Sequence, residues 1–278
     1  MITQTFEAAR VSLVGNRKCN QDRSLILSTE STSLLAVADG LGGHPRGEVA
    51  AQLFIDVCES LFRQQAKPLR DPEQFMLLCA HRAHQAIIAF GDRQSPPIAP
   101  RTTAVMAVIQ DGVAYWTHVG DSRLYLIRDN HVLAQTRDHS KVHYIRPEAG
   151  AESRARSAIT RCLGGLDQPP TVTAGAPTQL VPGDKLLLCS DGLWSQVSED
   201  QILMHLDLDV AIGDALQELA EEAERNGYPR SDNVTALSLS WQPRLARGGQ
   251  TTPAPKTDDR LSAAVRHLRK VLSKQKPS

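Results

Sequence analysis

The sequence has no cysteine pair at a spacing that would indicate a disulfide framework or a zinc site. Its five cysteines are an odd number, scattered along 278 residues without a CxxC motif. Disulfide-rich folds need paired cysteines and zinc knuckles need closely spaced ones, so neither is the basis of this fold. A reducing compartment is therefore expected.

Net charge and long apolar runs are also missing. Lys and Arg total 31, as do Asp and Glu, so the whole-chain charge gives no reason to expect a nucleic-acid or membrane protein. No apolar run approaches the roughly 20 residues of a membrane span. The N-terminal MITQTFEAAR lacks the basic-then-apolar order of a signal peptide. We expect a cytoplasmic protein without a transmembrane segment or a nucleic-acid partner.

The even charge balance conceals an asymmetry along the chain. Nine of the 31 basic residues, but only two of the 31 acidic ones, follow Trp241, which leaves an acidic body. Residues 242–257 include PRLARGGQTTPAPK, whose Gly, Pro and Thr content is typical of a linker. The main domain is therefore predicted over 1–241.

The tail at 258–278 is predicted to form a basic amphipathic helix, because four aliphatic residues recur at helical spacing among basic side chains. They are Leu261, Val265, Leu268 and Leu272. Two interpretations of the tail remain open. It could pack back on the acidic body, or it could dock to a partner or a membrane surface.

Short β-type runs alternate with helical stretches up to residue 241. Several runs are separated by tight turns, such as the one at 110–112, which leave no room for crossover helices and predict a mostly antiparallel sheet. The class is therefore α+β. The polar stretch 138–157 is predicted to be a mobile surface segment. Strands are predicted over 33–38, 102–109, 113–119, 123–128, 185–189 and 234–239, and helices over 47–65, 72–90 and 209–226.

Three aspartates stand at the ends of predicted strands. Asp39 closes the run LLAVA and Asp191 follows LLLCS, each with Gly next, whereas Asp232 precedes VTALSLS. If they converge, they form an oxygen-rich site suited to Mg²⁺ or Mn²⁺. Gly40 would let a backbone carbonyl reach a metal. Two ions sharing Asp39 would hold a bridging water, lower its pKa and clamp an in-line phosphoryl displacement.

The N-terminal stretch adds two further candidates just before another β-type run. Arg17 can grip a phosphate through two parallel hydrogen bonds, and Asp22 can orient metal-bound water. Taken alone, Arg17 fits a solvated surface charge better than a phosphate ligand.

Eight motifs follow one another along the chain. They are GNRKCNQD, LLAVADGLGGHPRGEVAA, RTTAV, THVGDSRLYLIR, QTRDHS, AITRCLGG, DKLLLCSDGLW and SDNVTALSL. From about residue 10 to 240 they resemble the PP2C-type (PPM) family of metal-dependent Ser/Thr protein phosphatases, particularly its compact bacterial members. The resemblance implies a four-layer α/β/β/α sandwich of two antiparallel sheets flanked by helices, with the metals at one end.

The resemblance also implies an activity. Metal-activated water at a centre of two, or three, Mn²⁺ or Mg²⁺ ions would hydrolyse phosphoserine and phosphothreonine without a covalent phosphoenzyme. Phosphorylated proteins would be the substrates, with a cognate Ser/Thr kinase as the source of the phosphate. The chain is expected to act as a monomer.

Ligand roles follow from the resemblance by position. It implies that Asp39 bridges two metals, that Gly40 supplies a carbonyl to one of them, and that Asp191 and Asp232 hold the second. Asp121, in the GDSR motif, would help to bind a third ion together with Asp191.

Catalytic roles follow in the same way. Arg17 matches the phosphate-binding Arg, and Asp22 matches the residue that orders metal-bound water. Gln21 replaces the Glu that the family usually has, which predicts weaker metal affinity. Leu41 stands where many eukaryotic members have the proposed acid His, so His44 in the bacterial GGH pattern becomes the candidate acid.

Two other positions distinguish this chain from the family pattern. Arg101 stands where Gly is common. The segment between His139 and Ile159 corresponds to the flap that shapes substrate access and looks shorter than usual. Its basic residues could attract an acidic phosphoprotein surface or belong to a solvated loop. These residues are Lys141, Arg146, Arg154 and Arg156.

The alternatives each lack a necessary feature. The glycine-rich stretch after Asp39 would need a parallel βαβ context to bind a dinucleotide. No cysteine has an Arg six residues later, as a cysteine-based phosphatase requires. An acidic body is unsuited to a two-metal nuclease. The remaining rival is a pseudophosphatase that binds phosphoproteins without cleaving them.

Overall fold

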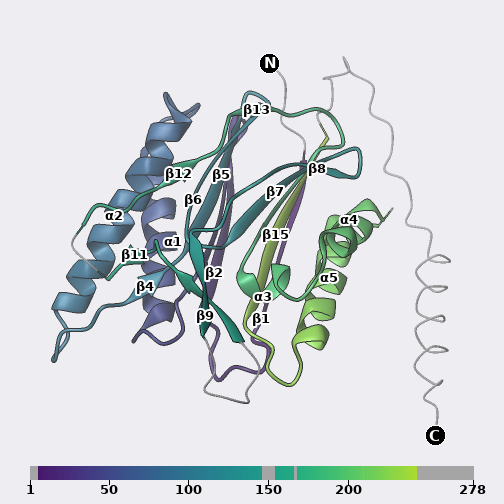
Figure 1. Ribbon diagram of the computed structural model, residues 1–278. Helices are drawn as coiled ribbons and strands as arrows, with labels where there is room; N and C mark the ends of the chain where they lie inside the picture. The colour runs from purple at the N-terminus through teal and green to yellow at the C-terminus, as the bar shows by residue number, and fades with distance from the viewer. Residues whose placement is uncertain (1–5, 146–153, 166–167, 209, 243–278) are drawn as a thin grey trace, which may run out of the picture. The chain divides into compact units, whose positions relative to one another are not determined.

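The computed structural model describes residues 6–145, 154–165, 168–208 and 210–242. Two large antiparallel sheets lie face to face, and helices cover the outer face of each (Figure 1). The predicted four-layer sandwich is thereby confirmed. The predicted linker and tail lie outside the described residues, apart from Gln242. No helix among the described residues is both long and apolar enough to cross a membrane.

The first sheet has the strand order β1-β15-β14-β7-β8, and every neighbouring pair is antiparallel. Helices α3, α4 and α5 pack their apolar faces on its outer side (Figure 1). The strands are β1 (Phe6–Leu13), β7 (Arg123–Arg128), β8 (His131–Gln135), β14 (Lys185–Cys189) and β15 (Val234–Trp241), and the helices are α3 (Asp191–Trp194), α4 (Glu199–Asp207) and α5 (Ile212–Gly227).

The second sheet has the order β12-β6-β5-β3-β2, with β13 also paired to β6, and is covered by α1 and α2. A small separate ladder joins β4 to β11. The strands are β2 (Asp22–Ser28), β3 (Thr32–Asp39), β4 (Arg101–Thr102), β5 (Ala104–Gln110), β6 (Val113–Val119), β11 (Leu163–Gly164), β12 (Thr173–Ala174) and β13 (Thr178–Gln179), and the helices are α1 (Gly47–Gln64) and α2 (Pro72–Asp92).

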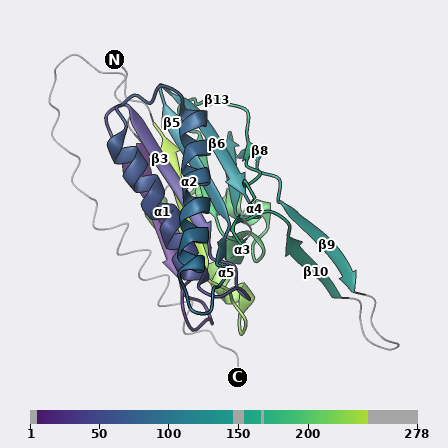
Figure 2. The same ribbon diagram turned by 90° about the vertical axis from the view of Figure 1, so that its left-hand side faces the viewer.

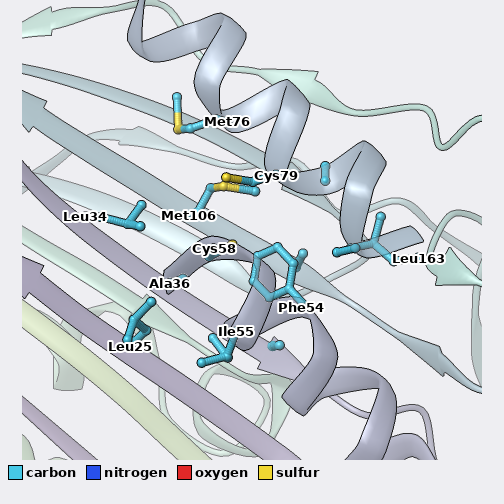
Figure 3. Packing of buried hydrophobic residues seen from close by; sticks show 14 of the residues in the cluster. Leu25, Leu34, Ala36, Phe54, Ile55, Cys58, Met76, Cys79, Met106 and Leu163 are labelled. Carbon is cyan, nitrogen blue, oxygen red and sulfur yellow. The ribbon is translucent and has the colours of Figure 1, made fainter. Parts of the chain in front are cut away.

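Strand β3 shows how an uninterrupted apolar run serves two cores at once. Successive side chains of a strand point to opposite faces of the sheet. Leu34 and Ala36 therefore pack beneath α1 and α2, whereas Leu35 and Val37 pack between the sheets. Figure 3 shows the first cluster, where Phe54 of α1 lies among the side chains of the sheet.

Local capping explains where two of the helices begin. Asp71 accepts a hydrogen bond from Gln74 N–H (3.0 Å) and Pro72 occupies the first turn of α2. Ser198 and Gln201 form a capping box at the start of α4. The three predicted helices are present as α1, α2 and α5, whereas α4 is not among those predicted.

The stretch 138–157, predicted as a mobile surface segment, contains most of two strands that were not predicted. Its backbone forms an antiparallel hairpin of β9 (Ser140–Ile145) and β10 (Arg154–Ile159). The letters SKVHYI contain a short β-prone run, which the surrounding charged and turn residues obscure. Figure 2 shows the hairpin extending away from the two large sheets.

The strand predicted over 102–109 is also different, because it is divided into β4 and β5. Thr103 lies between them and uses its backbone N–H and its hydroxyl to bond the main chain of Asp39. This interruption places β4 against the loop that follows β3. Strand β2 corresponds to the β-type run expected after Asp22, whereas β1, β8, β11, β12 and β13 are additions to the predicted set.

Candidate active site

Strand register brings aspartates together at one end of the sandwich. Asp22, the first residue of β2, lies directly opposite Asp39, the last residue of β3. In the other sheet, Ser190 N–H donates to Thr235 O (2.9 Å), which places Asp191 beside the start of β15. Residues far apart in the sequence therefore meet because their strands start or end at the same edge.

The main chain of Asp39 is held by two threonines. Its carbonyl accepts hydrogen bonds from Thr102 Oγ1 (2.8 Å) and Thr103 N–H (2.8 Å), and its N–H donates to Thr103 Oγ1 (3.0 Å). Thr103 Oγ1 also shares a hydrogen bond with Ser122 Oγ (2.7 Å). These contacts fix the backbone that carries the Asp39 carboxylate and join it to the turn that contains Asp121.

Gly40 packs against the beginning of α1. A Cβ at Gly40 would lie only 2.3 Å from the carbonyl carbon of Gly47. Gly40 N–H also donates to Gln21 O (3.2 Å). Glycine is required here because two main chains approach closely, a reason that the sequence alone does not reveal.

The carboxylates of this cluster strongly affect one another. Burial raises the pKa of Asp39 well above its ordinary value, and the charges of Asp22, Asp191, Asp121 and Asp232 raise it further, in that order. Burial, followed by the charge of Asp232, also raises the pKa of Asp191. Without a cation, the cluster carries more negative charge than its buried setting favours.

Asp22 is only 3% exposed and is supported by a hydroxyl group. Ser190 Oγ donates to Asp22 Oδ2 (2.7 Å), and Asp22 N–H donates to Asn20 Oδ1 (2.9 Å). Burial raises the pKa of Asp22 to about 7, although the hydrogen bond from Ser190 opposes this shift.

Asp121 lies in the turn between β6 and β7 and is 6% exposed. Its carbonyl accepts a hydrogen bond from Trp194 Nε1 (2.9 Å), and the Arg123 guanidinium stacks on the Trp194 ring at 3.5 Å. Burial and then the charges of Asp191 and Asp138 raise the pKa of Asp121 to about 7. Its Oδ1 is buried without a hydrogen-bond partner among the described residues.

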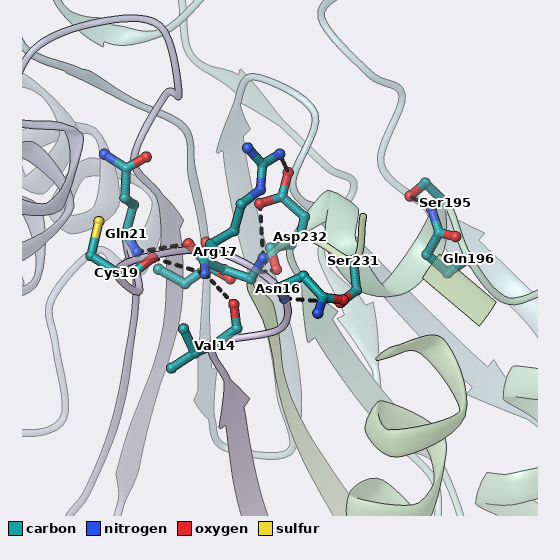
Figure 4. A network of polar contacts seen from close by, with 12 residues as sticks. Val14, Asn16, Arg17, Cys19, Gln21, Ser195, Gln196, Ser231 and Asp232 are labelled. Carbon is teal, nitrogen blue, oxygen red and sulfur yellow. Dashed lines mark hydrogen bonds and ion pairs between the residues drawn. The ribbon is translucent and has the colours of Figure 1, made fainter. Parts of the chain in front are cut away.

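Arg17 lies at the solvent-facing side of the cluster. Its Nη2 contacts Asp232 Oδ2 at 2.6 Å, and the two side chains are 54% and 41% exposed (Figure 4). The loop that carries Arg17 is tied to the segment just before β15, because Asn16 N–H donates to Ser231 O (3.1 Å) and Oγ (3.0 Å). An exposed ion pair contributes little to stability, but this one puts a guanidinium beside the carboxylates.

Asn233 anchors the same loop from the other side. Its Nδ2 donates to Val14 O (2.8 Å) and Cys19 O (3.0 Å), and its Oδ1 accepts from Gln21 N–H (2.8 Å). A Cβ at Gly192 would lie 2.0 Å from Asn233 O, so glycine is needed where α3 passes β15. Asn233 therefore acts as a support of the site.

The donor set fits a hard divalent cation. Carboxylate oxygens dominate it, and both the unpartnered Asp121 Oδ1 and the raised pKa values would be relieved by positive charge. Within the described ranges, no three His, Cys, Asp or Glu side chains already form a closed group around one point. Backbone carbonyls and waters would have to complete the shell, as Mg²⁺ and Mn²⁺ readily accept.

Comparison with known proteins identifies the family. The profile described as protein phosphatase 2C matches residues 12–229. The chain belongs to the protein phosphatase 2C family. It is 36% identical over 242 residues to the serine/threonine protein phosphatase PstP of Mycobacterium tuberculosis, covering 82% of this chain and 45% of PstP. It therefore spans about half the length of this curated relative.

Solved structures support the same fold. A structure of the PstP catalytic domain in complex with two manganese ions has a TM-score of 0.67 and 31% identity, and covers 86% of this chain and 100% of that one. The serine/threonine phosphatase Stp1 from Staphylococcus aureus has a TM-score of 0.75 and 26% identity, and covers 87% and 97%. The predicted membership of a bacterial PP2C-type family is thereby confirmed.

The structure of this PP2C-family chain brings most of the sequence-predicted site residues into one network. Asp22, Asp39, Asp121, Asp191 and Asp232 all influence the pKa of Asp39 or of each other. Gly40 and Arg17 are attached to the same network, through Gln21 O and Asp232 respectively.

His44 is the exception, because its principal charged neighbour is Arg101. Burial, followed by the positive charge of Arg101, lowers the pKa of His44. A lowered pKa reduces the protonated fraction at neutral pH, which weakens the case for His44 as a general acid. Arg101 itself lies close to Gly165, where an added Cβ would sit 2.5 Å from Arg101 Nε. This bulky residue thus links the His44 loop to the end of β11.

Gln21 points its side chain toward the beginning of α1. Its Nε2 donates to Glu48 Oε2 at 3.5 Å. The amide is therefore a neutral partner for an acidic neighbour. Of the basic flap residues, Arg146 lies outside the described residues, and the structure describes only the backbone of Lys141, Arg154 and Arg156.

Several supporting residues are not among the predicted site residues. Thr102, Thr103 and Trp194 hold the main chain at Asp39 or Asp121, and Ser122 bonds the Thr103 hydroxyl. The motifs RTTAV and GDSR carried a signal for three of them, because hydroxyl residues beside strand ends often bond the backbone. Nothing local in the sequence pairs Trp194 with Asp121.

Proposed function

We propose that this chain is a protein serine/threonine phosphatase that hydrolyses phosphoserine and phosphothreonine by attack of water on phosphorus. The observation that carries the proposal is the convergence of five aspartates beside Arg17 in a member of the protein phosphatase 2C family. The manganese in the related PstP catalytic domain supports the same reading.

Mn²⁺ or Mg²⁺ would be held by Asp39, the Gly40 carbonyl, Asp191 and Asp232, with Asp121 available for a third ion. When bound, such ions lower the pKa of water and neutralise charge on the phosphoryl group. Burial and mutual repulsion raise the pKa values of Asp39 and Asp191. A bound cation would stabilise the charged carboxylates and so offset both effects, which supports a role of these aspartates as metal ligands.

The chain's own side chains would bind and orient the reactants. Arg17 uses Nη2 for Asp232, and its remaining N–H groups can donate to a phosphate from the solvent-facing side. Asp22 would accept a hydrogen bond from a water and orient it, which its position opposite Asp39 and its bond from Ser190 support. His44 stays a candidate acid, although its lowered pKa reduces the protonated fraction at neutral pH.

The proposed substrates are phosphorylated proteins, as for the relatives that carry the name serine/threonine phosphatase. A cognate Ser/Thr kinase would produce them, and the enzyme would act in cytoplasmic signalling as a monomer. The basic tail at 258–278 would contribute to targeting by docking to a partner or to the acidic body.

Manganese-dependent phosphate release from a phosphothreonine peptide tests the proposal. We expect turnover with Mn²⁺, weaker or equal turnover with Mg²⁺, and loss of activity in Asp191→Asn. The rival pseudophosphatase would bind the peptide without releasing phosphate. A folded protein that is inactive with both metals would overturn the proposed activity in favour of this rival.

A further inference from the structure

His139 and Gly120 hold each other through a closed pair of hydrogen bonds. His139 N–H donates to Gly120 O (2.9 Å), and Gly120 N–H donates back to His139 Nδ1 (3.2 Å). One bond uses the backbone of His139 and the other uses its ring. The histidine therefore fixes both the position and the orientation of the peptide that precedes Asp121.

The acceptor role of Nδ1 determines the state of the ring. Because Nδ1 accepts a hydrogen bond from Gly120 N–H, the hydrogen of the neutral ring is on Nε2, which lies 2.9 Å from Thr173 Oγ1 as a donor. His118 stacks on the same ring, with centroids 4.4 Å apart. Burial, aided by the charges of His118 and Arg161, lowers the pKa of His139 to about 4, so the ring is neutral at neutral pH.

Gly120 has little freedom to move. Its φ of 101° lies in the left-handed region, and a Cβ at this position would lie 2.7 Å from the Thr103 side chain. Thr103 in turn bonds Asp39 and Ser122. A shift of Gly120 would therefore displace Asp121 relative to Asp39.

The same histidine is the base of the β9–β10 hairpin. His139 O accepts hydrogen bonds from Thr160 N–H (2.8 Å) and Thr160 Oγ1 (2.9 Å), immediately outside the two strands. The preceding residue, Asp138, forms a two-bond ion pair with Arg123 (2.9 Å each). The hairpin thus leaves the body of the protein at the residue that holds the Asp121 turn.

We propose that His139 is a positioning residue that fixes the Asp121 carboxylate relative to Asp39 and ties this carboxylate to the base of the β9–β10 hairpin. His139 acts through the Gly120 peptide and not by contact with substrate or metal. The inference deepens the proposed phosphatase function, because Asp121 is the candidate ligand of a further ion. Asp121 Oδ1, buried without a partner among the described residues, is the atom whose direction His139 controls.

Two substitutions separate the two bonds of the ring. In His139→Asn, the side-chain oxygen can take the place of Nδ1 and accept from Gly120, but the side chain is too short to reach Thr173. In His139→Gln, the amide nitrogen can replace the distal donor to Thr173, but no acceptor remains for Gly120. His139→Ala removes both bonds. His131→Ala is a remote control, whose ring bonds Asp129 O.

Mn²⁺ binding by isothermal titration calorimetry is the primary measurement, with phosphate release as the second. The ion of interest is the one whose binding is lost in Asp121→Asn. We expect its affinity to fall by about tenfold in His139→Ala and His139→Gln, which is the usual effect of removing a support of a ligand. His139→Asn should stay close to wild type, and His131→Ala should be unchanged.

A double-mutant cycle distinguishes positioning from general damage. If His139 acts through Asp121, then adding His139→Gln to Asp121→Asn should not weaken the remaining Mn²⁺ sites. An equal loss in both backgrounds would overturn the proposal, as would equal affinities for the Asn and Gln variants. If His139→Ala fails to fold, the Asn and Gln comparison decides alone.

The calorimetric result does not depend on the proposed activity. A wild-type protein that binds Mn²⁺ but releases no phosphate would refute the phosphatase function and still test His139. If Asp121→Asn leaves the number and affinity of Mn²⁺ ions unchanged, the role of His139 through Asp121 is wrong, whatever the activity.

Discussion

The apolar cluster beneath α1 and α2 and the carboxylate cluster at the strand ends both contain deeply buried side chains, but burial affects them in opposite ways. Leu34 is fully buried, and Asp22 is only 3% exposed. Removing a leucine side chain from water favours folding by about 1.5–3 kcal/mol. Removing a carboxylate from water costs free energy unless hydrogen bonds or a cation compensate for it.

The chain meets this cost partly with its own atoms. Ser190 donates to Asp22, and Thr102 and Thr103 hold the main chain of Asp39. The threonine bonds reach only the main chain of Asp39, so burial and the neighbouring charges still raise the pKa of its carboxylate. The apolar cluster therefore stabilises the fold without a ligand, whereas the carboxylate cluster lowers the stability of the metal-free protein.

The largest effect is expected from a substitution at the centre of the carboxylate cluster. In Asp39→Asn, loss of the charge shared by the proposed ions should lower kcat/KM by roughly 10³-fold, as expected when a major electrostatic contribution is removed. The metal-free variant should be at least as stable as wild type, because repulsion with Asp191 and Asp22 is relieved. Steady-state kinetics and urea unfolding in EDTA measure the two quantities. The exposed Asp56→Asn is the matched control, and a fully active Asp39→Asn would contradict the proposed site.

The next largest effect is expected from a substitution in the apolar cluster, which should lower stability whether or not metal is present. Leu34→Ala leaves a cavity and should lower the free energy of unfolding by about 3 kcal/mol. Because no charge changes, the loss should be the same with Mn²⁺ and with EDTA. Urea unfolding under both conditions measures it. Leu133→Ala, at a site that is 49% exposed, should have little effect on the free energy of unfolding. If the loss in Leu34→Ala depended on Mn²⁺, the apolar cluster would not be independent of the carboxylate cluster.

The apolar cluster and most of the fold could be predicted from the sequence, because period and turn signals are local. The run TSLLAVA predicts β3, and alternation explains how it serves two faces. The hairpin β9–β10 could not be predicted, because charged and turn residues obscure its short β-prone run. The division of β4 from β5 depends on Thr103 bonding the distant Asp39, which no local pattern encodes.

The candidate site divides in the same way. Asp39, Asp191 and Asp232 are visible as carboxylates at strand ends, but their meeting with Asp22 depends on the β2–β3 register. The need for glycine at position 40 comes from the packing of Gly47 and not from any motif chemistry. Residue types can thus be predicted from the sequence, whereas the contacts that orient them depend on pairing between distant strands.

Metal removal should lower stability through the carboxylate cluster and not through the apolar cluster. At a free Mn²⁺ concentration about 100 times the dissociation constant, binding to the folded state alone should stabilise the protein by about 2.7 kcal/mol. Leu34→Ala should retain this increment, whereas Asp191→Asn should lose most of it. Thermal unfolding with Mn²⁺ and with EDTA tests this prediction. Equal stability of wild type under both conditions would show that the carboxylates bind no cation.

The pH dependence of the metal-free protein should reveal the same cost with a smaller effect. Burial raises the pKa of Asp22 to about 7, above its ordinary value of 3.8, so the folded state binds more protons than the unfolded state between these values. Stability should therefore rise as pH falls from 8 to 6.5, by about 1 kcal/mol from this group. Urea unfolding in EDTA measures the change. Asp22→Asn should reduce the slope but not abolish it, because the pKa of Asp121 is also raised to about 7. A rise in stability with pH would contradict the raised pKa.

The smallest expected effect concerns Gln21, which lies between the carboxylate cluster and the beginning of α1. Its Nε2 contacts Glu48 at 3.5 Å, and its backbone carbonyl accepts from Gly40. Gln21→Glu adds a charge near the proposed ions and should raise Mn²⁺ affinity by about threefold, the size of an interaction between partly exposed charges. The same change places two carboxylates together, so the metal-free variant should be slightly less stable.

Gln21→Ala is the matched control for this last substitution, because it removes the amide contact without adding charge. Calorimetric Mn²⁺ titration of the three proteins separates the two effects: only the Glu variant should bind more tightly, while both should lose the contact with Glu48. If the Ala variant also gains affinity, the amide itself hinders binding. In that case the weaker metal binding predicted from the missing carboxylate has a steric cause and not an electrostatic one.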